Sequence, residues 1–477
     1  MNNKESKNNP EVKNVVENKL HPVTFIYAVL VVFLVFGFIA FGMIAFEAPL
    51  ELMFLLSWII VVPLLMVLGY KYKELQNMAW DMAVSSFEPN VILLVVGAMI
   101  GTWIASGTIP YIIYLGLKFI SPKIFLISAL LLSSFTSLAT GTSWGTLGTV
   151  GLALIGIGNA MGVPSQMTAG AIISGAYFGD KMSPLSDSTI LSASIAGTPV
   201  MKHIKHMMYT TIPTYLISAV IFTFLGLKYS TNTYDLYITT EIMNTFESTF
   251  KFSFVELLPI ILVLILLVKN IPSIISLLIG TISGGVIAVI HQHESIHNVL
   301  NYMINGFTLH TGNGFVDKLL NRGGTNSMIS AFLAIFLALC ISGMLEKTGI
   351  LSVLVKPLIK KCGTSTFKII MATIILTYIT NSIGSSMLFA SIVTGTMMKD
   401  IYRKNGLAPE NLSRTLEDAG TLGAVLIPWN ANALYAAQML GVSQFAFIPF
   451  CFLNWMTPLM DLIYAKTGIT IKKNISK

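Results

Sequence analysis

Residues 179–193 read GDKMSPLSDSTILSA, and the interpretation of the whole chain starts from this stretch. It lies between apolar segments, yet it contains Asp180, Lys181 and Asp187. Pro184 removes a backbone hydrogen bond, so a helix that runs through this stretch is expected to break there. A charged side chain inside a membrane is costly and by default marks a functional site. The stretch therefore predicts a broken membrane helix whose polar groups handle an ion or a solute.

The composition is typical of a membrane protein. Of 477 residues, 54% are apolar and 11% are charged, whereas soluble domains carry about 25% charged residues. At about 20 residues per span, the length allows about ten membrane helices. The net charge of +7 comes from basic residues beside apolar segments, where they set orientation, so nucleic-acid binding is not expected. The GxxxxGK[ST] nucleotide-binding motif is absent, which argues against a primary pump, and a membrane-embedded enzyme is the least expected class, so neither an enzyme nor a bound cofactor is predicted.

Apolar runs and interrupted zones divide the chain into two halves. Lysine and arginine accumulate on the cytoplasmic side of membrane proteins. Their positions place both termini in the cytoplasm, provided that each interrupted zone contains one hairpin that enters and leaves the membrane on the same side. The predicted segments are a polar cytoplasmic tail at 1–22, a first half at 23–227 with a hairpin at 124–162 and a broken helix at 164–200, an external loop at 228–252, and a second half at 253–477 with a hairpin at 366–404 and a broken helix at 412–440.

The two halves are related in sequence. Residues 179–193 align with GAVLIPWNANALYAA at 423–437. The counterpart segments 108–123 and 350–363 fall on opposite sides of the membrane, so the repeat is expected to be inverted. Inverted repeats with discontinuous helices that meet at the bilayer midplane are typical of secondary transporters. The sequence predicts an all-α polytopic membrane protein with about ten transmembrane helices, two re-entrant hairpins and two broken helices.

Polar residues at the hairpin tips and at the breaks are candidate ligands for a hard cation such as Na⁺. Glycines let the backbone leave the helix, and hydroxyl and freed carbonyl oxygens are the ligands that hard cations prefer. The alternative is close helix packing through small residues. The candidates for cation and proton binding are Thr142, Ser143, Asp180, Ser186 and Asp187 in the first half and Asn381 and Ser382 in the second.

Asp187 is the preferred ligand for Na⁺ and the preferred proton acceptor. Hydroxyl residues flank it and no basic residue is adjacent. One carboxylate that binds either ion makes Na⁺ and H⁺ compete, which is the minimum requirement for exchange. For Asp180, an ion pair with Lys181 that holds the broken helix is the alternative.

The second half keeps the break and lacks the carboxylate, because Ala431 aligns with Asp187. Asn430 and Asn432 donate and accept hydrogen bonds, which suits either a cation shell or a carboxylate-bearing solute.

Two further sets of charged residues point less specifically to a function. Glu417 and Asp418 are candidates for gating or proton relay, with a solvated helix start as the alternative, whereas an outer-loop salt bridge, or else a vestibule, is expected from Asp317, Lys318 and Arg322.

Several blocks carry a resemblance to a known family. They are GTSWGTLGTVGLALIGIG at 141–158, SGAYFGDKMSPLSDSTILSASIAGT at 174–198, KHIKHMMYTT at 202–211, LLNRGG at 319–324, and NLSRTLEDAGT followed by LIPWN within 411–430. These blocks look like the signatures of the NhaC-type family of Na⁺/H⁺ antiporters. Ser143, Asp180 and Asp187 lie within them.

The resemblance implies exchange of cytoplasmic Na⁺ for external H⁺ by a multi-pass protein of the bacterial inner membrane. It also implies a homodimer. Similar sequences include malate/lactate exchangers coupled to Na⁺ and H⁺, so exchange of small carboxylates, bound between the hairpin tips by Ser143 and Asn381, is the alternative. Where the family pattern often has Thr-Asn, this chain has Thr189-Ile190-Leu191, which leaves the choice of substrate open. A passive channel, which needs no competition between ions, is the remaining alternative.

Overall fold

The structure is a computed structural model that describes residues 22–85, 87–230, 236–269, 271–361 and 363–473. These residues form helices, and the β-pairing among them is an isolated antiparallel bridge between Leu407 and Lys473. Within these described ranges, seven helices are long and apolar enough to span a membrane, or up to ten if each of three bent helix pairs counts as one span. The predicted all-α membrane fold is confirmed. Apart from its last residue, the predicted tail at 1–22 lies outside the described residues.

The first half of the chain begins with two long apolar helices. Its helices are α1 (Phe25–Phe46), α2 (Leu50–Val67), α3 (Tyr72–Ser85), α4 (Phe87–Ala105), α5 (Thr108–Phe119), α6 (Pro122–Thr140), α7 (Ser143–Thr146), the π-helix η1 (Leu147–Gly151), α8 (Leu152–Ala160), α9 (Ser165–Met182), α10 (Asp187–Ala196) and α11 (Val200–Ser230).

The second half contains more short helices. They are α12 (Leu236–Thr249), the 3₁₀-helix η2 (Phe254–Leu257), α13 (Leu258–Val268), α14 (Ser273–Ile290), α15 (Ile296–Asn305), α16 (Gly314–Leu320), the 3₁₀-helix η3 (Thr325–Met328), α17 (Ile329–Lys347), α18 (Ile350–Lys361), α19 (Thr366–Gly384), α20 (Met387–Lys404), α21 (Pro409–Leu416), the π-helix η4 (Glu417–Thr421), α22 (Leu422–Ala424), α23 (Ala431–Leu440), α24 (Gln444–Phe447), the 3₁₀-helix η5 (Ile448–Phe450) and α25 (Phe452–Thr467).

The outer helices expose apolar side chains, as lipid-facing helices do. Ile26 of α1 and Ile59 of α2 are 80% and 72% exposed. Hydroxyl, amide and carboxylate side chains are instead buried among the helices that surround the two breaks. In a bilayer this arrangement removes polar groups from lipid, where each unsatisfied one costs several kcal/mol.

The helix boundaries repeat between the halves. α6 and α19 begin at 122 and 366 and end at 140 and 384, so both boundaries are 244 residues apart. The segments that follow the breaks, α10 at 187–196 and α23 at 431–440, obey the same shift. The two halves therefore have the same sequence of helix, tight turn, helix, broken helix.

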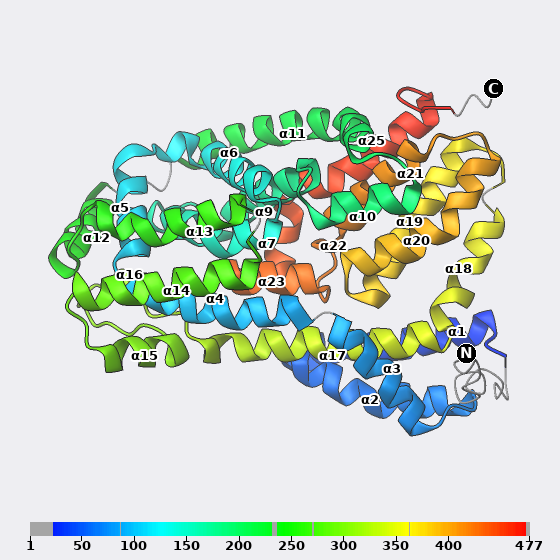
Figure 1. Cartoon of the computed structure of the whole chain (residues 1–477), viewed down its shortest axis with the longest axis horizontal. Helices are drawn as coiled ribbons and strands as arrows, with labels where there is room; N and C mark the ends of the chain where they lie inside the picture. The colour runs from blue at the N-terminus through cyan, green and yellow to red at the C-terminus, as the bar shows by residue number, and fades with distance from the viewer. Residues whose placement is uncertain (1–21, 86, 231–235, 270, 362, 474–477) are drawn as a thin grey trace, which may run out of the picture.

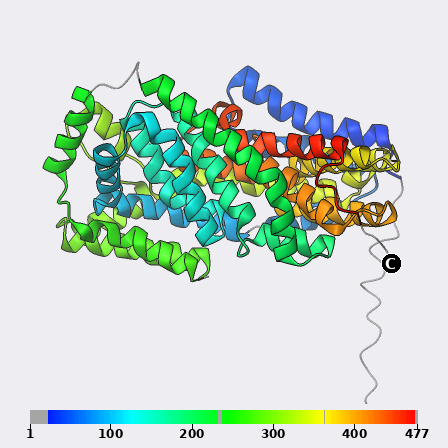
Figure 2. The same ribbon diagram turned by 90° about the horizontal axis from the view of Figure 1, so that it is seen from above.

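The two halves meet around the breaks. In Figure 1 α10 extends from the middle of the molecule toward one end and α23 toward the other, as an inverted repeat requires. The hairpin of the first half, in cyan, and that of the second, in yellow and orange, lie toward opposite ends in Figure 1 and Figure 2. α10 packs against α20 and α21, whereas α23 packs against η1. Each broken helix thus touches the hairpin of the other half.

The segment at 228–252, predicted as a loop, contains the helix α12. Ile242 and Phe246 of α12 are buried and four residues apart, the spacing that places side chains on one face of a helix, and the buried Phe250 follows directly after the helix. Tyr114 of α5 donates a hydrogen bond of 2.6 Å to Glu247 of α12. The segment is therefore a packed amphipathic helix, a pattern that the search for continuous apolar spans passes over.

Candidate functional site

Each hairpin tip contacts the break of its own half. Gly141 ends α6 with a φ of +71°, and a Cβ atom on it would lie 2.9 Å from Cβ of Leu185 in the first break. Ser385 ends α19 with a φ of +50°, and its carbonyl accepts a hydrogen bond of 3.2 Å from the backbone N–H of Ala431, where α23 begins. Both turns are left-handed, a conformation that glycine adopts at least cost. The tip and the break of each half therefore lie together in the structure.

Asp180 is the carboxylate at the centre of the first half. It lies near the end of α9 and is 4% exposed. Its Oδ2 accepts hydrogen bonds of 3.1 Å from the backbone N–H and 2.6 Å from the hydroxyl of Ser143, and its Oδ1 accepts one of 2.6 Å from the hydroxyl of Ser186. Three donors and two hydroxyl oxygens therefore surround this carboxylate, and no described cationic side chain lies within 4 Å of it.

Asp187 and Thr142 lie at helix starts. Asp187 is the first residue of α10, and its side chain is exposed and makes no hydrogen bond or ion pair with another described residue. A carboxylate in the first turn is favoured by the helix dipole, which accounts for its position without an ion. Thr142 caps α7, where its hydroxyl oxygen accepts a hydrogen bond of 3.3 Å from the N–H of Gly145. The structure thus brings Ser143 and Ser186 to Asp180, and not to Asp187.

The asparagines of the second half form a chain that reaches the first half. Asn381 donates a hydrogen bond of 2.9 Å to the carbonyl of Gly420, and the amide of Asn430 donates one of 3.1 Å to the carbonyl of Asn381. Asn432 in turn donates one of 3.0 Å to Oδ1 of Asn430. The Ser382 carbonyl accepts a hydrogen bond of 2.7 Å from the indole of Trp429.

Asn432 is the end of this chain that touches the first half. Its Oδ1 accepts hydrogen bonds of 2.9 Å from the indole of Trp144 and 3.0 Å from the hydroxyl of Tyr177. These contacts join the first hairpin and α9 to the second break. Asn381, Asn430 and Asn432 are all buried, so the three amides help to fix the two breaks relative to each other.

Glu417 and Asp418 are fully buried, so the alternative of a solvated helix start is wrong. Both lie in η4, the π-helical turn that interrupts the second broken helix. Glu417 accepts hydrogen bonds of 2.9 Å from Ser192 and 3.5 Å from Ser188 of α10. The packing of α10 against η4 and α21 excludes these carboxylates from solvent.

Lys181 pairs with Asp418 across the two halves. Both side chains are fully buried, and Thr210 of α11 donates a further hydrogen bond of 3.2 Å to Oδ1 of Asp418. The alternative in which Lys181 pairs with Asp180 is therefore wrong. Consecutive residues on a helix point about 100° apart, so Asp180 faces the serines of its own half while Lys181 faces the other half.

The buried charges do not balance. Asp180, Glu417 and Asp418 contribute three carboxyl groups, and Lys181 contributes one ammonium group. With all four groups ionised the cluster would carry two net negative charges, and burial disfavours such a state unless cations or protons are taken up. The arrangement is suited to binding a small cation, a proton, or each in turn.

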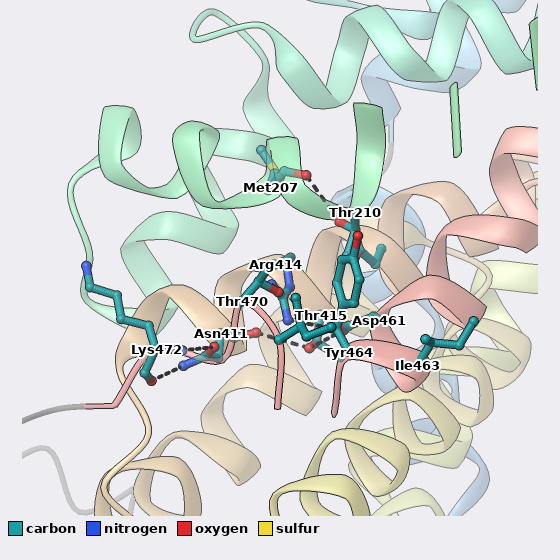
Figure 3. A network of polar contacts seen from close by, with 12 residues as sticks. Met207, Thr210, Asn411, Arg414, Thr415, Asp461, Ile463, Tyr464, Thr470 and Lys472 are labelled. Carbon is teal, nitrogen blue, oxygen red and sulfur yellow. Dashed lines mark hydrogen bonds and ion pairs between the residues drawn. The ribbon is translucent and has the colours of Figure 1, made fainter. Parts of the chain in front are cut away.

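The residues that precede Glu417 are held by a second buried ion pair, drawn in Figure 3. Arg414 of α21 donates a hydrogen bond of 2.8 Å to Asp461 of α25, whose second oxygen accepts one of 2.6 Å from Thr415. The C-terminal segment adds bonds of 3.0 Å between Arg414 and Thr470 and of 2.6 Å from Asn411 to the carbonyl of Lys472. The start of the second broken helix is thereby anchored on two sides.

The interpretation of the sequence missed several of these partners. Ser188 and Ser192 are four residues apart, so the spacing alone places them on one face of α10. Lys181 and the pair Arg414–Asp461 are visible only as isolated charges in apolar surroundings, a signal that marks them as important without naming their partners.

Comparison with known proteins assigns the family. The model of the Na⁺/H⁺ antiporter family matches residues 5–199 and 175–469. This chain belongs to the Na⁺/H⁺ antiporter family. Members of this family are transporters rather than enzymes, and the predicted NhaC-type resemblance is confirmed.

Two curated relatives of the antiporter differ in the substrates that their names state. The malate-2H⁺/Na⁺-lactate antiporter of Bacillus subtilis (strain 168) is 41% identical over 88% of this chain and 90% of its own length. The Na⁺/H⁺ antiporter NhaC of Alkalihalophilus pseudofirmus is 34% identical over 85% of this chain and 87% of its own. The solved structure of Neisseria gonorrhoeae MtrF, from a class of antimetabolite efflux pumps, covers 80% of this chain and 82% of its own, with 14% identity and a TM-score of 0.36.

Proposed function

We propose that this protein exchanges Na⁺ for H⁺ across the bacterial inner membrane by alternating access. The observation that carries the proposal is the buried group of three carboxyls and one ammonium that joins the two halves. Such a group takes up either a cation or protons. Na⁺ and H⁺ therefore compete for the same carboxylates, as coupled exchange requires. Membership of the Na⁺/H⁺ antiporter family supports the proposal. The exchange needs no bound cofactor.

Asp180 is the carboxylate that we propose to bind Na⁺. The hydroxyls of Ser143 and Ser186 already lie 2.6 Å from its oxygens, and their own oxygen atoms supply further ligands for a hard cation. The tip of the first hairpin and the first break would then close on the ion together. Asp187, exposed at the start of α10, remains the competing prediction for the Na⁺ ligand.

Two serines connect Asp180 to Glu417. The hydroxyl of Ser186 lies 3.1 Å from that of Ser188, and Ser188 donates a hydrogen bond of 3.5 Å to Glu417. Hydroxyls both donate and accept hydrogen bonds, so this chain provides a route by which a proton moves between the two carboxylates. We propose that Glu417 receives the proton that Na⁺ displaces from Asp180.

The experiment compares two neutral variants in proteoliposomes. With an imposed pH gradient reported by a dye, the wild-type protein dissipates the gradient on addition of Na⁺. Asp180→Asn is expected to abolish this response, and Asp187→Asn to retain it, because only Asp180 is enclosed by hydroxyl donors. Asp400→Asn is the matched control, since Asp400 is 68% exposed and pairs with Arg403. Loss of exchange in Asp187→Asn alone would instead assign the ion to Asp187.

Exchange of small carboxylates is the second candidate function, and the 41% identical malate-2H⁺/Na⁺-lactate antiporter favours it. The same proteoliposomes separate the two. If Na⁺ alone dissipates the pH gradient, the protein is a cation/proton antiporter. If the gradient changes only when malate or lactate is also present, the carboxylate is part of the transported set.

The proposal also covers the orientation of the protein in the membrane and its oligomeric state. We place both termini in the cytoplasm and α12 outside, which agrees with their separation in Figure 1, where the two ends of the described chain lie at one end of the molecule and α12 at the other. A reporter active only in the cytoplasm is then expected to work when fused after residue 477 and to fail when inserted near α12. A homodimer, proposed from the family resemblance, is tested by light scattering of the purified protein.

A further inference from the structure

A polar cavity lies at the C-terminal end of α23, whereas Asn430 and Asn432 lie at the start of this helix. It has a volume of about 510 Å³. α23 begins beside Asn430 and has ten residues, which corresponds to about 15 Å of helix. The cavity is therefore separate from the Asp180 cluster. Its polar lining comes from Asn305, Thr308, Lys318, Asn321, Arg322, Ser327 and Gln438.

The charge that lines this cavity is positive. Lys318 and Arg322 are its ionisable residues, and it has no carboxylate in its lining. Within the part of the chain that the structure describes, neither residue forms an ion pair. The expected outer-loop salt bridge among Asp317, Lys318 and Arg322 is thus wrong, because Asp317 instead accepts hydrogen bonds of 2.8 and 2.7 Å from Thr311.

The hydrogen bonds from Thr311 lower the pKa of the Asp317 carboxyl. This group therefore stays ionised at neutral pH while bound to its own loop. A neighbouring cavity of about 260 Å³ is lined by Glu51 and shares Gln438 and Gly441 with the basic cavity. The hydroxyl of Ser330 donates a hydrogen bond of 2.6 Å to Glu51. Acid and base are therefore kept in adjoining cavities.

The guanidinium group of Arg322 has N–H groups that donate no hydrogen bond to a described residue. Its Nη2 donates a hydrogen bond of 3.2 Å to the carbonyl of Met439, near the end of α23. Its Nε and Nη1 donate to no described residue. A guanidinium group fixed at one nitrogen still presents further N–H groups, and its planar fork matches a carboxylate in two parallel hydrogen bonds.

We propose that this cavity binds a small organic carboxylate through Arg322 and Lys318. The proposal rests on the second candidate function, the exchange of small carboxylates, and assigns that substrate class to this cavity; it does not require that Na⁺ alone drives proton movement. The guanidinium group of Arg322 holds the carboxylate, the ammonium group of Lys318 adds a second positive charge, and Gln438 supplies a polar contact. An acid of three or four carbons fits the volume with room for water.

The test is equilibrium binding of radiolabelled lactate and malate to the purified protein in detergent, in a sulfate buffer without Na⁺. Saturable binding is expected for at least one of the two acids. Arg322→Gln is expected to weaken it at least about tenfold, as loss of a charged hydrogen-bond donor does. Lys318→Gln is expected to weaken it less, because Lys318 is exposed. Lys251→Gln, which removes an exposed lysine outside the cavity, is the control and is expected to bind normally.

Further arms separate the proposal from its rivals. Chloride and inorganic phosphate at equal concentration are expected to displace the label less well than unlabelled acid, and equal displacement would show a general anion site and overturn the proposal. Binding that persists in Arg322→Gln/Lys318→Gln would place the carboxylate elsewhere and overturn the proposal.

Because Arg322 also donates a hydrogen bond to α23, each variant is checked for monodisperse elution and for Na⁺-driven proton movement without organic acid. Retained exchange with lost carboxylate binding supports the proposal. Loss of both through misfolding is tested again with Lys318→Gln, because the exposed Lys318 side chain makes no hydrogen bond or ion pair with another described residue.

Discussion

At the scale of single residues, two neighbours have opposite roles. Asp180 and Lys181 follow one another on α9, yet Asp180 binds serines of its own half and Lys181 binds Asp418 of the other. A buried ion pair gains little over a well-packed neutral pair, but removal of one partner leaves an uncompensated buried charge. The value of the Lys181–Asp418 pair is thus best measured by comparison of single and double variants.

Lys181→Met is expected to destabilise the protein by about 3–5 kcal/mol, because it leaves Asp418 buried and unpaired. Lys181→Met/Asp418→Asn is expected to recover most of that loss, since neither residue is then charged. Lys347→Met, which breaks an exposed pair with Asp81, is the control and should cost less than about 1 kcal/mol. Thermal unfolding of the purified variants provides the measurement. Equal losses in Lys181→Met and Lys347→Met would contradict the assignment of Lys181–Asp418 as a buried pair.

At the scale of elements, the first hairpin depends on a turn that a side chain would disturb. Gly141 is left-handed and its tip lies against Leu185 of the first break. The tip positions Ser143, which binds Asp180 through both its backbone and its hydroxyl. A shift of this turn would move two of the three donors that surround the carboxylate.

Gly141→Ala is expected to destabilise the protein and to slow Na⁺-driven proton movement. Left-handed backbone alone costs a non-glycine residue about 1–2 kcal/mol, and the new Cβ would also lie 2.9 Å from Leu185. Gly406→Ala separates the two effects, because Gly406 has a φ of +65° with no atom within 4 Å of the added carbon. Gly141→Ala should therefore cost at least about 1 kcal/mol more. If both variants unfold and exchange alike, the contact between tip and break is unimportant.

At the scale of the whole molecule, the segment that follows α25 packs against α21, the helix that leads into Glu417 and Asp418. After α25 the chain passes along α21, where Lys472 exchanges two hydrogen bonds with Asn411, of 2.6 and 3.1 Å, and Thr470 accepts one from Arg414. The turn that follows α21 carries Glu417 and Asp418. The residues that follow α25 thus help to hold α21, as Figure 3 shows.

A chain that ends at Thr467 is expected to unfold at lower temperature and to exchange Na⁺ for H⁺ more slowly than the full chain. Each hydrogen bond lost from α21 accounts for about 1 kcal/mol. A chain that ends at Lys473 keeps these contacts and should behave as the full chain does. The comparison uses thermal unfolding and the proteoliposome assay. Normal exchange and stability after removal of residues 468–477 would show that α25 alone holds α21.

Local sequence determined the helices, their breaks and the repeat. Apolar runs such as that of α1 predict spans because apolar length is a property of consecutive residues. Pro184 and Gly141 indicate the first break and the first tip because backbone constraints act within one or two residues. The hydroxyl and carboxylate groups of the site were predicted as a set for the same reason, since an ionisable residue in an apolar region is visible without its partners.

Only the tertiary structure decided which carboxylate is enclosed and what each charge binds. Asp187, preferred from its neighbours in sequence, is exposed, whereas Asp180 is buried among Ser143 and Ser186. Lys181 and Asp418 are 237 residues apart in the chain. Burial and pairing depend on how each helix is rotated about its axis and on what packs against it. One residue along a helix changes the direction of a side chain by about 100°, so the partner of a charge is set by the packing of the two halves and not by its neighbours in sequence.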